Sequence, residues 1–112
     1  MTKDSRLYIH HILEGIECIE RWTCSCDKES FGKEKMRYDA IVRNLQTITE
    51  SLQRLPQNIK DLYPQIPWRD VSGFRNIIVH DYLDGIDKDI LWTIITVELP
   101  VIKQVMLQLS KN

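Results

Sequence analysis

Apolar side chains recur along the first part of the chain at the spacing of an amphipathic helix. Four isoleucines follow one another at steps of three or four residues, whereas three glutamates fall outside that stripe. The isoleucines are Ile9, Ile12, Ile16 and Ile19, and the glutamates are Glu14, Glu17 and Glu20. The pattern predicts a helix from about Asp4 to Trp22 with its isoleucine face in the core. Turn-forming residues follow, and Gly32 is expected to end them.

A heptad-like apolar pattern predicts a second helix from about Lys33 to Leu55. Its apolar residues step by four, three, four and three, which suits packing along another helix. They are Ile41, Leu45, Ile48, Leu52 and Leu55. Pro56 should end this helix, because proline removes a backbone hydrogen bond. We expect a loop with at most one short turn from Pro56 to Pro67.

A third helix is predicted to begin at Pro67 or Trp68, since proline suits the first turn of a helix. Its inward row is Val71, Phe74 and Ile78. It should fray near His80, and Asp84-Gly85 marks the turn that follows.

The fourth predicted helix, from about Asp87 to Leu109, is apolar over a wide arc. Asp87 should cap its N-terminus and Pro100 should kink it. The apolar positions are Ile90, Leu91, Ile94, Ile95, Val97, Val101, Ile102, Val105, Met106 and Leu109. So wide an arc exceeds what one neighbouring helix covers, which indicates a dimer contact. With no period-two alternation anywhere, the sequence predicts one all-α domain over residues 1–112, an up-and-down four-helix bundle.

Composition limits the classes of function. A net charge of −1 and a pI near 6.3 exclude a surface that binds nucleic acid through general basicity, so any such contact must be local. Arg37, Arg43, Arg69 and Arg75 are the candidates. The sequence contains no uninterrupted run of about 18 apolar residues, so it does not predict a membrane span. The charged N-terminal segment does not resemble a signal peptide, so we expect a cytosolic protein without a membrane partner.

The cysteines do not predict a metal site. Cys24 and Cys26 lack the two-residue spacing of a zinc knuckle, and with Cys18 they make an odd count. Reduced thiols are the simpler interpretation in a cytosolic protein. We therefore expect neither a metal nor another cofactor.

A polar cluster interrupts the predicted third helix and suits phosphodiester chemistry. Arg75 can hold phosphate oxygens with forked hydrogen bonds, and His80 titrates near neutrality, so it can move a proton. Asn76 lies one turn before His80 and can orient the imidazole or the phosphate. Tyr82 can stack on a base or donate to a phosphate. Together these residues suggest RNA cleavage.

The spacing of this cluster raises a geometric condition. Arg75 and His80 are five residues apart, which places them about 140° apart around a regular helix. Either the helix ends before His80, or two copies of the chain complete each other's site around a two-fold axis.

Each residue of the cluster also has a purely structural interpretation. His80 can pair with a helix C-terminus, Arg75 can extend to the surface, and Tyr82 can lie at the edge of the core. Trp68 and Trp92 are most simply anchors of the core or of an interface.

The segment from Arg75 to Tyr82 reads Arg-Asn-Ile-Ile-Val-His-Asp-Tyr and resembles the Arg-x4-His-x-Tyr motif of HepT-type toxins, a branch of the HEPN superfamily. The preceding Pro67-Trp68 and the Leu91-Trp92 and Leu99-Pro100 pairs of the last helix are similar to the family's flanks. One departure is Thr49-Glu50-Ser51, where many relatives have Gly-Glu-Ala.

The resemblance implies an α-helical homodimer whose motif helices face each other across a cleft. It implies a metal-independent endoribonuclease toxin of a type VII toxin–antitoxin pair, with Arg75 and His80 as the cleaving residues. The implied antitoxin is an MntA-type minimal nucleotidyltransferase that transfers AMP to Tyr82. The alternative is a non-catalytic helical module that binds a nucleotide or serves as an adaptor for such a nucleotidyltransferase.

Overall fold

The chain folds as a bundle of helices. The structure is a computed structural model that describes residues 1–71, 73–74 and 87–111. Its elements are α1 (Lys3–Thr23), α2 (Lys35–Gln53), α3 (Gln57–Leu62), α5 (Lys88–Thr93), the π-helical turn η1 (Ile94–Glu98) and α6 (Leu99–Ser110). Residues 68–71 and 73–74 are also helical. No strand occurs among the described residues, which confirms the all-α prediction.

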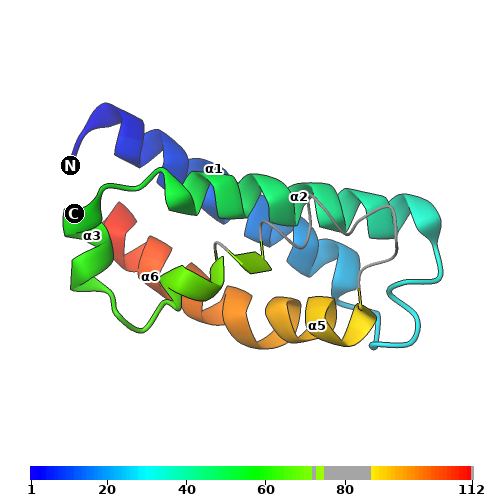
Figure 1. Cartoon of the computed structure of the whole chain (residues 1–112). Coiled ribbons are helices and arrows are strands. Elements are labelled where there is room, and N and C mark those ends of the chain that lie inside the picture. The colour runs from blue at the N-terminus through cyan, green and yellow to red at the C-terminus, as the bar shows by residue number, and fades with distance from the viewer. Residues whose placement is uncertain (72, 75–86, 112) are drawn as a thin grey trace.

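The helices run lengthwise and alternate in direction. α1 is antiparallel to α2 on one side and to the continuous α5–η1–α6 helix on the other, so both termini lie at the same end of the bundle (Figure 1). The first turn of α1 is capped by Thr2, whose hydroxyl oxygen accepts a hydrogen bond from the backbone N–H of Ser5 at 3.1 Å.

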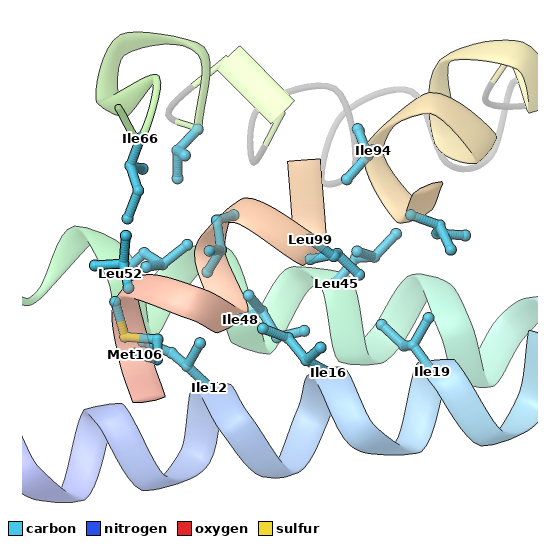
Figure 2. Packing of buried hydrophobic residues seen from close by; sticks show 14 of the residues in the cluster. Ile12, Ile16, Ile19, Leu45, Ile48, Leu52, Ile66, Ile94, Leu99 and Met106 are labelled. Atoms are coloured by element: carbon cyan, nitrogen blue, oxygen red, sulfur yellow. The ribbon is translucent and has the colours of Figure 1, made fainter. Parts of the chain in front are cut away.

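The core forms where the predicted apolar stripes meet. Every residue of the isoleucine stripe of α1 is buried, and so is every residue of the heptad-like pattern of α2. Figure 2 shows Ile12, Ile16 and Ile19 facing Leu45, Ile48 and Leu52, with Leu99 and Met106 of α6 completing the cluster. Gly15 lets α1 and α2 approach closely, since a Cβ there would lie 3.0 Å from Cγ1 of Ile48.

The fourth helix contains an irregular turn at the place where the sequence predicts a kink. Its residues before Pro100 form the π-helical turn, in which the backbone N–H of Leu99 donates to the carbonyl oxygen of Ile94, five residues back. Pro100 has no N–H and its ring would collide with a carbonyl of the preceding turn. A widened turn relieves that collision without breaking the helix. Asp87 caps α5 as predicted, accepting from the backbone N–H of Asp89 at 2.7 Å.

The segment between Pro56 and Pro67 is more regular than predicted. Instead of one short turn it contains α3, whose N-terminus forms when Ile59 and Lys60 donate to the carbonyl oxygen of Pro56 at 3.0 and 3.2 Å. Ile59 and the following Ile66 are both buried. Burial of these two side chains stabilises a helix that local sequence alone would not predict.

One helix is long and apolar enough to cross a membrane by length and composition alone. It is Lys88–Ser110, whose most apolar window has a mean hydropathy of 1.6 and is 39% buried. The sequence criterion of an uninterrupted apolar run missed it because isolated polar residues such as Thr93 and Lys103 break the run. Core helices meet the same criterion, and this helix packs on α1, so the finding is weak evidence for a membrane span.

Candidate functional site

The predicted catalytic cluster lies outside the described residues. Arg75, Asn76, His80 and Tyr82 all fall within residues 75–86, as do the predicted end of the third helix and the turn at Asp84-Gly85. The roles of these four side chains therefore remain predictions. The structure describes the residues on both sides of the motif segment.

The upstream side of the segment is tied to the end of α2. The indole N–H of Trp68 donates to the carbonyl oxygen of Tyr63 at 3.0 Å. The ammonium of Lys60 lies 5.8 Å from the centre of the Trp68 ring, and it also donates to the carbonyl oxygen of Gln53 at 2.9 Å. Val71 is buried. These contacts confirm the prediction that Trp68 is an anchor and fix where the motif segment begins.

The downstream side is held by the connection between α1 and α2. Phe31 is fully buried, and its ring centre lies 5.0 Å from that of Trp92 in α5. The backbone at Gly32 lies directly under the Lys88 side chain, since a Cβ there would be 2.5 Å from Cε of Lys88. The ammonium of Lys28 contacts a carboxylate oxygen of Asp89 at 3.0 Å. Residues 28–32 thus hold the first turn of α5.

A tight turn presents Lys28 to this contact. Ser30 donates from its backbone N–H to the carboxylate of Asp27 at 2.8 Å, and Asp27 returns a hydrogen bond to the Ser30 hydroxyl at 3.0 Å. The bonds from Ser30 hold the pKa of Asp27 below its usual value. The hydrogen bond to Asp89 raises the pKa of Lys28. Both groups are exposed, so their charges contribute little to the stability of the fold.

The two sides of the segment meet at a hollow of about 250 Å³. Its lining residues are Phe74, Asp89, Ile90, Thr93 and Ile94. Phe74 was predicted to belong to the inward row of the third helix, but its side chain is only half-buried and forms a wall of this hollow. The residue just before Arg75 therefore lies against the residues that follow the motif segment. Sequence reasoning missed this hollow because its residues come from two separate stretches of the chain.

The last helix leaves part of its predicted apolar arc exposed. Ile90 is 40% exposed, Val97 is 55% exposed and Val101 is 37% exposed, whereas the other apolar residues of the arc are buried. The helix therefore presents an uncovered apolar row, defined here by these three residues, next to the hollow. Exposed apolar residues that share one helix face are typical of protein–protein contacts.

The arginines proposed for local RNA contact differ in their surroundings. Arg37 donates to Sγ of Cys26 at 2.9 Å and pairs with Glu34 at 3.2 Å, so it holds the start of α2 rather than a ligand. Arg43 and Arg69 are exposed on different helices. Arg75 is outside the described residues.

The described residues offer no obvious metal site. No group of three or more histidine, cysteine, aspartate or glutamate side chains among them could hold an ion. Cys18, Cys24 and Cys26 are free thiols.

Comparison with protein families gives one match that covers most of the chain. The profile of a family described as "Ribonuclease HepT-like" matches residues 12–109, which include the entire motif segment. The comparison with solved structures gave no significant match.

Three curated relatives illustrate the range of similar proteins. A protein of Thermococcus cleftensis named "Probable ribonuclease HepT" is 33% identical over 92% of this chain and 93% of its own length. A "Putative RNase" of Caldanaerobacter subterraneus is 32% identical over 98% of both chains. A protein of Methanocaldococcus jannaschii named "Gamma-glutamylcyclotransferase and putative RNase" is 33% identical over the whole of this chain, which spans about half (52%) of that protein.

The downstream anchor can be tested with two substitutions. We expect Phe31→Ala to lower the free energy of unfolding by about 3–5 kcal/mol, because it leaves a cavity beside Trp92. Lys28→Ala should change it little, because both charges of its ion pair are exposed. Urea unfolding measures both effects, and amide exchange at Leu91 and Trp92 reports the first turns of α5. Equal losses in the two variants would contradict an apolar anchor.

Proposed function

Because the chain belongs to the family of HepT-like ribonucleases, we propose that it is an endoribonuclease that cuts RNA through Arg75 and His80 without a metal ion. The observation that carries the proposal is the family match across residues 12–109, because it takes in the Arg-x4-His-x-Tyr segment together with its flanks. The relatives named as ribonucleases over nearly their full length support the same reaction class.

The reaction is attack of a ribose 2′-hydroxyl on the adjacent phosphorus. The 2′-oxygen forms a new bond to phosphorus, the bond to the 5′-oxygen breaks, and the products carry a cyclic phosphate and a 5′-hydroxyl. One imidazole of His80 takes the 2′-proton, and a protonated imidazole gives a proton to the leaving oxygen. Arg75 neutralises the charge that builds on the phosphate oxygens. Asn76 orients His80 or the phosphate.

A homodimer suits this scheme, because it contains two copies of His80. A neutral copy can act as the base while a protonated copy acts as the acid. It also satisfies the geometric condition set by the five-residue spacing of Arg75 and His80. The uncovered apolar row of Ile90, Val97 and Val101 lies on the helix that follows the motif segment. We assign the part of this row at Val97 and Val101 to the contact with a second copy of the chain.

Regulation by covalent modification follows from the same proposal. We propose that the protein is the toxin of a type VII toxin–antitoxin pair acting in the cytosol, and that an MntA-type minimal nucleotidyltransferase silences it by transferring AMP to Tyr82. Tyr82 lies two residues after His80. The added phosphate would repel the RNA backbone, and the added adenosine would fill the space that the RNA needs.

The catalytic assignment predicts loss of cleavage on substitution of either motif residue. We expect His80→Ala and Arg75→Ala each to lower the rate of RNA cleavage at least about 100-fold, with unchanged helix content by circular dichroism. His11→Ala, at an exposed histidine of α1, is the matched control and should cleave like the parent. The assay uses purified protein with RNA in EDTA and identifies cyclic phosphate ends. Intact RNA in the parent reaction, with tight nucleotide binding, would instead favour the non-catalytic adaptor module.

The dimer contact predicts a monomer when charge enters the apolar row. We expect Val97→Glu to shift the protein from dimer to monomer in sedimentation equilibrium, because a buried unpaired carboxylate is costly. Leu7→Glu makes the same kind of change at an exposed residue of α1 and should leave the dimer intact. A Val97→Glu protein that stays dimeric would place the contact elsewhere.

The modification predicts a specific mass change. Co-expression with the nucleotidyltransferase should add the mass of one or more AMP groups, less water, to the peptide that contains Tyr82. Tyr82→Phe should remain unmodified and toxic to growth in the presence of the same partner. Modification of another peptide, or none at all, would remove Tyr82 as the target.

A further inference from the structure

The hollow beside the motif segment is lined by an aromatic ring, aliphatic side chains and polar oxygens. It is lined by Phe74, Asp89, Ile90, Thr93 and Ile94 and has a volume of about 250 Å³. That is below the range of about 300–1,000 Å³ typical of sites for drug-sized ligands. A single flat ring system suits it better than a larger ligand.

The walls of the hollow offer a stacking surface. The ring of Phe74 is half-buried, so one part of it packs against the core cluster while the remainder stays accessible. Ile90 and Ile94 supply the facing aliphatic wall. A nucleobase stacks well between an aromatic ring and aliphatic side chains, because its two faces are apolar and its edges are polar.

The rim of the hollow carries a carboxylate, which only accepts hydrogen bonds, and a hydroxyl, which can accept or donate. Within the part of the chain that the structure describes, the Thr93 hydroxyl makes no hydrogen bond, and Thr93 is exposed. One carboxylate oxygen of Asp89 contacts Lys28 at 3.0 Å, which offsets its charge and leaves the second oxygen available. A carboxylate and a hydroxyl oxygen both accept hydrogen bonds from an amino group on a base.

We propose that this hollow is a subsite for one nucleobase of the RNA substrate, and that it favours a base with an exocyclic amino group over uracil. This inference rests on the proposed ribonuclease function. Phe74 directly precedes Arg75, so a base held here belongs to a nucleotide next to the phosphate that Arg75 holds. Phe74 supplies the stacking surface, and the Asp89 carboxylate, which only accepts hydrogen bonds, supplies the preference for the amino group. The Thr93 hydroxyl can accept from an amino group or donate to a carbonyl oxygen, so it adds affinity without selectivity.

A second copy of the chain is the competing occupant. The polar rim argues against it, because a dimer contact that covered Asp89 and Thr93 would leave both without water. Val97 and Val101 continue the apolar row away from the hollow and give the second copy its own surface. The hollow therefore lies at the end of the row rather than under it.

The test measures RNA binding separately from cleavage. The His80→Ala protein, which does not cut in this scheme, is titrated into fluorescein-labelled hexamers of adenylate, cytidylate and uridylate, and fluorescence anisotropy gives the dissociation constants. We expect the adenylate and cytidylate hexamers to bind more tightly than the uridylate hexamer. Adding Phe74→Leu should weaken binding to all three about tenfold, because it removes the ring but keeps an apolar side chain. Phe74→Trp should restore binding.

Two further variants test the rim. Thr93→Val keeps the shape of the side chain and should weaken binding of the adenylate and uridylate hexamers about equally, because a hydroxyl can accept from an amino group or donate to a carbonyl oxygen. Asp89→Ala should reduce the preference for adenylate over uridylate, whereas Lys28→Ala removes only the ion pair and should keep that preference. If Lys28→Ala reproduces the effect of Asp89→Ala, the carboxylate holds the turn rather than a base, and its assigned role is wrong.

The outcomes separate this proposal from the proposed function. Binding that is unchanged by Phe74→Leu, or a Phe74→Leu protein that becomes monomeric, would overturn the subsite. Absence of binding by any hexamer would overturn it as well. Base-selective binding that depends on Phe74, in a parent protein that leaves RNA intact, would support the subsite and contradict the ribonuclease.

Discussion

The close approach of α1 to α2 is the constraint on which the arrangement of the molecule depends. The two helices pack through continuous apolar faces, and Gly15 allows the backbone of α1 to lie against Ile48. Core side chains in such a contact are fixed at the density of a solid, so the helices cannot slide or rotate freely. α6 then packs on α1, and the connection after α1 presents Phe31 to α5. The start of the last helix is therefore positioned by the first helix pair rather than by its own sequence.

That arrangement gives the residues on each side of the motif segment their own anchor. Upstream, the indole of Trp68 donates to the carbonyl oxygen of Tyr63 just after α3, and its ring lies near the ammonium of Lys60, which also donates to Gln53 at the end of α2. Downstream, Phe31 and Trp92 form an apolar contact, and Lys28 and Asp89 form an ionic one at its edge. The apolar contact contributes most of the stability, since an exposed ion pair contributes little. Catalysis by positioned side chains depends on such support from the surrounding structure.

The sequence was informative wherever apolar periodicity alone decides the outcome. The boundaries of α1 and α2 and their buried faces follow from the spacing of isoleucine and leucine, and the Asp87 cap follows from residue type. Only one short turn was predicted where α3 forms, because local sequence does not report the burial of Ile59 that accompanies this helix. The position of Pro100 predicts a steric conflict with the preceding turn of the helix. It does not predict that a π-helical turn relieves this conflict. The hollow joins Phe74 to residues of α5 that lie more than a dozen positions away, and no local pattern reports such a meeting. The chemistry of Arg75 and His80 was predicted from residue types and a family resemblance. The described residues lie on both sides of these two residues and do not include them.

The charge of the chain bears on how such a protein would hold RNA. Most nucleic-acid-binding proteins gain affinity by releasing counterions from phosphates, which requires clustered lysine and arginine. Here the net charge is −1, and Arg37, one of the few candidate cations, already pairs with Glu34. Affinity must then come from a small number of contacts at the site, in which stacking of a base contributes about as much as several exposed phosphate contacts. The proposed pairing of Phe74 with Arg75 would meet that requirement, because an aromatic side chain adds affinity without adding charge. Recognition at the proposed subsite would require unstacked, single-stranded RNA, since a base within a duplex cannot reach a hollow of this size.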